Sequence, residues 1–155
     1  MSDQSVFQYE QADDSAGFLL WKITALWQQK LAVLLGDFGI TQTQYAIMAS
    51  LKWFEEKHEP VTQGHLVEHT KIDKMTVSKS IRKLEEAGFV SRSPSAIDTR
   101  AVDVKFTAFG MRQIRAAIVA VENADEEFFS CLSKRQLNEY RTLTISVIAG
   151  NTLSV

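Results

Sequence analysis

Cationic and short polar side chains gather on one side of a segment between residues 74 and 83. Val77, Ile81 and Leu84 recur at the spacing of one helical face, which predicts a helix with an apolar and a polar side. This helix is expected to run from Lys74 to about Ala87. A helix fits the major groove of duplex DNA, where polar side chains meet base edges and long cations meet phosphates. The predicted DNA-contact residues on this helix are Lys74, Met75, Thr76, Ser78, Lys79, Arg82 and Lys83.

A further cation lies in a predicted turn. Residues 89–93 and the alternating residues 102–106 are predicted strands, and the short polar connection between them favours an antiparallel hairpin. The tip of this hairpin carries Asp98, Thr99 and Arg100, which complete the predicted DNA-contact set. We expect Arg100 to enter the minor groove, whose negative potential attracts cations.

The segment from His65 to His69 matches H-x-x-E-H, a pattern found in zinc peptidases. On a helix its two histidines share a face and can bind one metal ion. Such an enzyme needs a third protein ligand on a larger scaffold, and Leu66 in the same short helix has to pack into the domain. We therefore predict no enzymatic activity, no cofactor and no metal, and leave open a regulatory metal at His58, His65 or His69.

Cys131 is the only cysteine, which excludes an internal disulfide and a multi-cysteine zinc site. It follows Phe128 and Phe129 at a predicted turn between two helices. An unreactive, mostly buried thiol is therefore expected in preference to a redox switch.

Four large aromatic residues have two alternative roles. Trp21, Trp27, Trp53 and Phe54 can pack in the core or at a dimer interface, or they can line a pocket for an aromatic effector. Both alternatives stay open, and no effector-binding residues are assigned.

The composition limits the class of protein. The chain has 155 residues, of which 45% are hydrophobic and 23% charged, so it is expected to be globular and not disordered. Seven glycines and two prolines are too few for the many turns of an all-β fold. The sequence shows no apolar run of about 20 residues and no leader at its start, which predicts a cytoplasmic protein without a membrane partner.

The charge is unevenly distributed. The whole chain has a net charge of −2, whereas residues 60–110 carry an excess of two cations. This middle segment is the only basic third of the chain, which favours a polyanionic partner.

Capping signals divide the rest of the chain into helices. Residues 1–13 are predicted to be a flexible tail, followed by a helix from about Asp14 to Leu35. A side chain that accepts a hydrogen bond from the first turn marks the start of a helix. The residues expected in this role are Thr41, Thr62, Asp73, Thr107 and Ser133.

Two helices have apolar patterns of interest, and that of the first helix is wider than one small core needs. Leu19, Leu26 and Val33 form a second stripe beside the main apolar stripe of the first helix. The long helix after residue 107 has a near-heptad seam from Met111 to Phe128, interrupted by Asp125. The wide face of the first helix suggests contact with a partner as well as with the chain's own core.

In order, these elements predict a mainly α fold with a small β-hairpin wing (α+β), a winged helix-turn-helix with a helical dimerisation region. The chain also resembles the MarR (multiple antibiotic resistance regulator) family of bacterial transcription factors over about residues 14–150. The matching segments are Gly39–Tyr45, Val61–Gln63, Leu66–Glu68, Asp73–Lys79, Leu84–Val90, Asp98–Val102 and Phe106–Gly110.

The resemblance implies a homodimer that binds a pseudo-palindromic operator and is released by a small molecule or by oxidation. Residues 14–36 and 108–150 would form the dimerisation region, and residues 37–107 the DNA-binding domain. The family pattern places major-groove contacts on residues 74–79 and a minor-groove contact on Arg100, with Asp98 holding Arg100 or the wing backbone. We expect repression, and a small aromatic or anionic effector.

Three departures from the family pattern are present, of which the two that replace arginines lower the positive charge. Arg92 is followed by Ser93 instead of a second arginine, Thr99 stands in a wing that often reads Asp-Arg-Arg, and Met75 replaces the usual serine. The reduced charge of the wing and the acidic net charge of the chain support an alternative function, a winged-helix protein-interaction module or antirepressor that does not bind DNA. A salt-dependent gel shift distinguishes the two functions.

Overall fold

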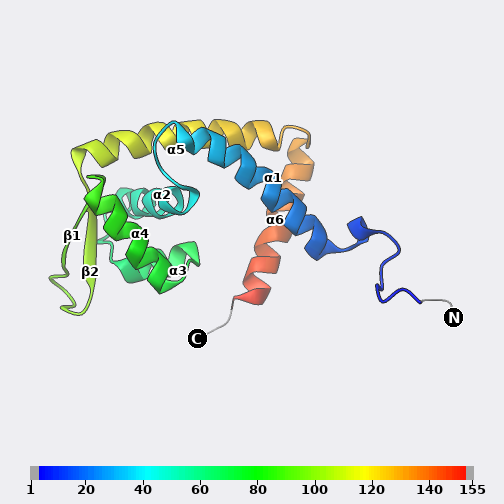
Figure 1. Ribbon diagram of the computed structural model, residues 1–155, viewed down its shortest axis with the longest axis horizontal. Helices are drawn as coiled ribbons and strands as arrows, with labels where there is room; N and C mark the ends of the chain where they lie inside the picture. Colours follow the sequence, from blue (N-terminus) through cyan, green and yellow to red (C-terminus); the bar gives the residue numbers. More distant parts are fainter. Residues whose placement is uncertain (1–3, 153–155) are drawn as a thin grey trace. The chain divides into compact units, whose positions relative to one another are not determined.

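The computed structural model describes residues 4–152 and confirms a mainly helical fold with one small hairpin (Figure 1). The chain begins with a 3-10 turn, continues through four helices to the hairpin, and ends with two further helices. The elements are η1 (Ala12–Asp14), α1 (Ala16–Gly36), α2 (Gln42–Glu56), α3 (Gln63–Thr70), α4 (Lys74–Glu86), β1 (Val90–Pro94), β2 (Val102–Phe106), α5 (Ala108–Phe128) and α6 (Lys134–Asn151).

The chain forms two compact units that divide within α5, between Val121 and Glu122. The first contains η1, α1 to α4, the hairpin and most of α5, and the second contains the end of α5 and α6. These units reflect contacts within one chain, whereas the predicted dimerisation region concerns contacts between two chains. The predicted division into dimerisation and DNA-binding regions therefore remains a prediction.

The predicted capping residues stand at the helix starts. Thr41 and Gln44 form a reciprocal capping box at α2, in which each side chain accepts a hydrogen bond from the other's backbone N–H. Ser133 and Gln136 do the same at α6. At α5, Thr107 Oγ1 accepts the N–H of Gly110 at 3.0 Å. These local bonds fix where the helices begin.

The N-terminal segment has more structure than predicted. Residues 12–14 form a 3-10 turn, held by an ion pair of 2.7 Å between Asp13 and Lys22 of α1. Ser15 then caps α1, so this helix begins at Ala16 and not at Asp14. The first three residues of the predicted tail lie outside the described residues.

The helix-turn-helix pair packs its apolar side on α2. The turn after α3 places Lys71 in the left-handed region with a φ of 58°, and Asp73 then begins α4. A set of apolar side chains from α2, α3 and α4 is almost fully buried in one core. Its members are Ile47, Met48, Leu51, Leu66, Val77, Ile81 and Leu84.

The near-heptad seam of α5 serves the chain's own core. Ile114 and Val121 are buried, and Met111 and Ile118 pack against the same core. Ile114 and Val121 are therefore committed to the chain's own core, and a contact of the rest of the seam with a partner remains a prediction. The same spacing is expected for a helix that packs on its own domain and for one that packs on a second chain, because one face of the helix is buried in either arrangement.

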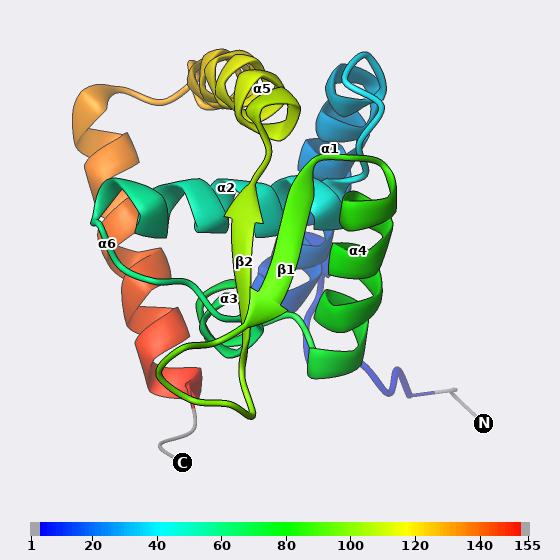
Figure 2. The same ribbon diagram turned by 90° about the vertical axis from the view of Figure 1, so that its left-hand side faces the viewer.

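The hairpin, which we call the wing (residues 90–106), lies beside α4 with β1 nearer to that helix (Figure 2). Its strands are antiparallel, with Arg92 opposite Val104. The first strand begins one residue later than predicted, because the N–H of Phe89 is bonded to the carbonyl of Leu84 in the turn after α4. The N–H of Val104 also donates to the carbonyl of Val61 at 2.9 Å, which ties β2 to the segment before α3.

Between residues 4 and 152, no helix combines the length and apolar character needed to span a membrane.

Candidate nucleic-acid interface

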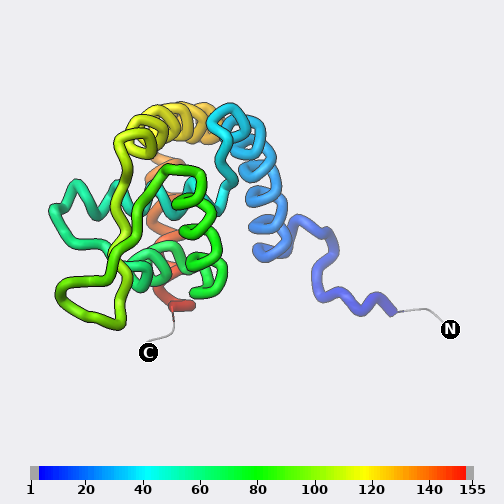
Figure 3. Tube along the Cα trace, turned by 60° about the vertical axis from the view of Figure 1, so that its left-hand side comes forward, coloured from blue at the N-terminus to red at the C-terminus, as the bar shows by residue number. Residues whose placement is uncertain are grey.

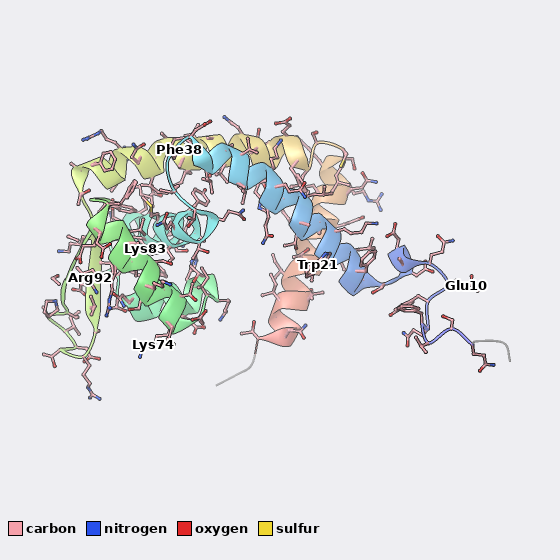
Figure 4. All side chains as sticks on the ribbon, in the orientation of Figure 1. Glu10, Trp21, Phe38, Lys74, Lys83 and Arg92 are labelled. Atoms are coloured by element: carbon pink, nitrogen blue, oxygen red, sulfur yellow. The ribbon has the colours of Figure 1, made fainter. Side chains whose placement is uncertain are left out.

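The predicted DNA-contact residues of α4 lie together on the solvent-exposed side of this helix. Val77, Ile81 and Leu84 are fully buried, which turns the polar side of the helix to the surface. Figure 4 labels Lys74 and Lys83 along this helix. All the predicted α4 contact residues line one open surface hollow with Glu86: Lys74, Met75, Thr76, Ser78, Lys79, Arg82 and Lys83.

The wing tip is organised by its own side chains. Asp98 Oδ1 accepts the backbone N–H of Arg100 at 3.0 Å. The expectation that Asp98 holds the wing backbone is therefore confirmed. The buried hydroxyl of Ser95 accepts from the N–H groups of Ile97 and Asp98 at 3.3 Å each. These bonds leave Thr99 and Arg100 exposed on a fixed backbone.

The wing tip and the N-terminal end of α4 lie at the same end of the first unit, as Figures 2 and 3 show. Ile97, 84% exposed at the tip, was not among the predicted residues, and its spacing gave no signal for it. The geometry thus presents one helix face and one hairpin tip toward the same side, an arrangement suited to neighbouring grooves of a duplex.

Thr76 has a different polar role from the one predicted. Its hydroxyl donates to Asp73 Oδ2 at 2.6 Å, and its backbone N–H donates to Asp73 Oδ1 at 2.9 Å. These hydrogen bonds, that from the hydroxyl first, lower the pKa of Asp73. The hydroxyl proton of Thr76 is thus used to begin α4, and the hydroxyl oxygen, as an acceptor, and the methyl group remain for a ligand.

A carboxylate and a guanidinium join α4 to the wing. Glu85 Oε1 accepts from Arg92 Nη2 at 3.1 Å and from Nε at 3.2 Å, and Glu85 Oε2 accepts the backbone N–H of Arg92 at 3.1 Å. The side-chain bond from Arg92 lowers the pKa of Glu85. Sequence reasoning missed this pair, although opposite charges on either side of a tight turn are a usable signal. Arg92, labelled in Figure 4, is thus a residue that positions the wing.

We predict opposite effects for two neighbouring neutralisations on α4. Glu85→Gln should weaken DNA binding several-fold, because the wing loses its charge-assisted tie to the helix. The control Glu86→Gln removes the same charge from an exposed residue of the hollow and should leave binding unchanged or stronger. Fluorescence anisotropy on one duplex measures both. Equal effects in the two variants would show that only net charge matters.

The histidine segment has other bonding partners. His65 Nδ1 accepts the N–H of Thr62 at 3.2 Å in the capping box of α3. His69 Nδ1 lies 2.8 Å from the hydroxyl of the buried Ser50. The ring of Phe54 contacts both imidazoles. Within residues 4–152 no three metal-ligating side chains come together, and a regulatory metal remains untested.

Cys131 is exposed, so the prediction of a mostly buried thiol is wrong. In the second unit Phe129 contacts Phe128 on one side and Tyr140 on the other, each with ring centroids 5.1 Å apart. The aromatic residues beside Cys131 therefore pack with one another and leave the thiol at the surface.

The four large aromatic residues divide between surface and core. Trp21 and Trp53 are exposed, with the ammonium of Lys57 above the Trp53 ring, while Trp27 and Phe54 pack against the core. A separate cavity of about 430 Å³ lies between α2, β2 and the start of α5. Its lining includes Leu51, Glu55, Glu59, Val104, Lys105, Phe106 and Met111.

Comparison with known proteins decides the family. Residues 36–124 match the ArnR1-like winged-helix domain. The chain belongs to the ArnR1-like winged-helix family. It is 36% identical over 122 residues to the HTH-type transcriptional regulator YdcH of Bacillus subtilis, covering 79% of this chain and 83% of YdcH. It is 25% identical to the HTH-type transcriptional repressor Rv2887 of Mycobacterium tuberculosis, covering 85% and 93% of the two chains.

Solved structures share the fold of this chain over most of its length. A MarR-family regulator from Rhodococcus sp. RHA1 has a TM-score of 0.79 at 23% identity, covering 94% of this chain and 100% of that one. Staphylococcus aureus MepR in complex with DNA has a TM-score of 0.79 at 20% identity, covering 90% and 99%. CouR from Rhodococcus jostii RHA1, bound to p-coumaroyl-CoA, has a TM-score of 0.78 at 22% identity, covering 95% and 100%.

These findings confirm the predicted resemblance to the MarR family. The ArnR1-like winged-helix protein is a transcriptional regulator with a DNA-binding fold, and its relatives are regulators and not enzymes.

Proposed function

We propose that the chain is a homodimeric repressor that binds a pseudo-palindromic operator and leaves it when a small effector binds. The observation that supports this most is the single exposed hollow on α4, which brings together four cations and three further predicted contact residues. In this proposal the first half of α4 meets base edges in the major groove, while Arg82 and Lys83 meet phosphates. Arg100 enters the minor groove, with Asp98 and Thr99 shaping the tip around it.

The apolar surface of α1 supports the homodimer. This helix exposes Leu19, Leu26 and Val33, the second stripe identified in the sequence, and Trp21 is 73% exposed. Soluble monomers seldom expose so much contiguous apolar surface. A second copy would cover it, and the two α4 helices would then meet half-sites about 10 base pairs apart.

The second unit also exposes apolar surface. Helix α6 exposes large apolar side chains along its length: Tyr140, Leu143, Ile145, Val147 and Ile148. We propose that residues 14–36 and 108–150 form the dimerisation region and residues 37–107 the DNA-binding domain. The seam residues of α5 that pack on the chain's own core are left out of the proposed contact between copies.

Repression and effector release are proposed from the relatives. Rv2887 is described as a repressor, and CouR binds p-coumaroyl-CoA, an aromatic and anionic molecule. In this chain the cavity between α2, β2 and α5 has apolar walls such as Leu51 and Phe106. Its charged lining residues are one cation, Lys105, and two carboxylates, Glu55 and Glu59. We propose a small aromatic or anionic effector, and a site of action in the cytoplasm, where the DNA of a bacterial cell lies.

Selection of bound sequences from a random duplex library at about 0.1 M salt tests the proposal. We expect an enriched pseudo-palindrome with half-sites about 10 base pairs apart. Affinity for it should fall in the range of about 10⁻⁸ to 10⁻¹¹ M and decline steeply with salt. No enrichment, together with no gel shift at low salt by refolded protein, would contradict DNA binding and favour a protein-interaction module.

We predict that Lys79→Ala and Arg100→Ala each weaken operator binding at least tenfold, because both half-sites lose a cationic contact. Size-exclusion chromatography should show an unchanged dimer, since both side chains are exposed and outside α1 and α6. The control Lys57→Ala removes an exposed cation from the end of α2 and should bind normally. Unchanged affinity in both test variants would refute the assignment of these residues.

A further inference from the structure

We infer that Met75 recognises the C5-methyl group of a thymine in each half-site, so that this residue selects a T·A pair in the operator. The inference rests on the proposed DNA binding and adds to it the chemistry of one base contact. It arises from an apolar side chain that stands in the middle of a cationic surface.

Met75 is 83% exposed in the first turn of α4. Val77, two residues later and so on the other side of the helix, is fully buried. Met75 therefore lies on the side of α4 that faces away from the core, among the residues that line the hollow. An exposed thioether there adds little to the packing of the chain and is available to contact a partner.

The side chains in the first turn of α4 have few hydrogen-bond donors to offer a base. The hydroxyl proton of Thr76 is already donated to Asp73, and both carboxylate oxygens of Asp73 accept from Thr76. Met75 has no donor at all. Among the first three residues of the helix, the free donor is the ammonium of Lys74, a flexible point charge suited to phosphate.

The apolar side chain of Met75 can distinguish bases by one group in the major groove, the C5-methyl group of thymine. Thymine carries a C5-methyl group there, whereas the other base edges present donors and acceptors. Those polar edges would lose water against Met75 without gaining a partner, which is costly. Thymine instead offers an apolar contact to the flexible, polarisable methionine side chain. The geometry thus favours thymine opposite the start of α4.

Substitution of deoxyuridine for each thymine of the selected operator tests this, because it removes only the methyl group. For the full-length wild-type chain we expect one thymine position per half-site at which the change weakens binding about fourfold, the factor for one buried methyl. Both half-sites together should give about fifteenfold. Anisotropy with labelled duplexes measures these ratios.

The variants decide whether Met75 makes the contact. Met75→Leu should keep the preference for thymine over deoxyuridine, and Met75→Gln, of similar length but polar, should lose it. Met75 is exposed, so neither variant should lower the thermal midpoint. The control Ile97→Ser alters an exposed apolar residue of the wing and should leave the thymine preference intact.

Two results would overturn the inference. Equal binding of thymine and deoxyuridine at every position would mean that no methyl is recognised. A preference that survives in Met75→Gln would assign it to another residue. Both leave the proposed DNA binding standing, whereas failure to select any operator would refute that proposal and this inference with it.

Discussion

The double variant Leu26→Asp, Val33→Asp is expected to be monomeric and to bind the operator at least a hundredfold more weakly than the wild-type chain. These side chains are 57% and 79% exposed on one stripe of α1, so two carboxylates there should not disturb the core. In a dimer they would be buried without a countercharge, which strongly opposes association. A monomer has only one DNA-binding domain, so it loses the gain in affinity of about 10²- to 10⁴-fold that two linked domains provide.

Sedimentation equilibrium and anisotropy on the selected operator measure the two effects. The control Thr24→Asp places a carboxylate at an exposed position on the opposite side of α1 and should remain dimeric. Circular dichroism should show the helical content of the wild-type chain in all variants. A double variant that stays dimeric would show that this stripe is not buried between copies.

Gly110→Ala is expected to lower the stability of the first unit by about 1–3 kcal/mol or more. An added Cβ would overlap the carbonyl oxygen of Phe89 and lie within 2.7 Å of its carbonyl carbon. The same carbonyl accepts the N–H of Thr107 at 3.1 Å, so the backbone cannot simply move away. The wing leaves α4 and enters α5 at this crossing, and the strain should therefore also displace the wing.

The thermal midpoint and operator affinity of Gly110→Ala should both fall, the former by several degrees. Gly17→Ala is the matched control: Gly17 is also helical, and its added Cβ would meet its nearest heavy atom at an ordinary 3.9 Å. That control should be neutral or slightly more stable, since alanine favours helix over glycine. A stable Gly110→Ala with normal affinity would contradict the close approach.

Features held by bonds between near neighbours could be predicted from the sequence. The caps at Thr41 and Asp73 join residues three apart, so the residue types alone identify them. The burial of Val77, Ile81 and Leu84 follows from their spacing on one helix. Together these local signals were sufficient for the helix-turn-helix and for the polar face of α4.

Features that depend on competing partners could not be predicted in the same way. The spacing placed Thr76 on the polar face of α4, but it did not show that its hydroxyl donates to Asp73. Spacing alone cannot tell a seam that meets a second chain from one that packs on its own core, as Ile114 does. The exposure of Cys131 depended on how its aromatic neighbours pack with each other.

The wing is tied at both strands, and this limits what an effector can change. Through Arg92 the first strand is bonded to α4, and through Val104 the second is bonded to the segment that begins α3. A hairpin that is bonded at both strands has no independent hinge at its base. The two parts of a protomer proposed to contact the grooves, α4 and the wing, therefore move together as one rigid body. In the proposed homodimer, the remaining variable is then the separation of the two DNA-binding domains. The proposed release by an effector would be a mismatch between the spacing of these domains and the helical repeat of the duplex, with each protomer's own contact surface unaltered.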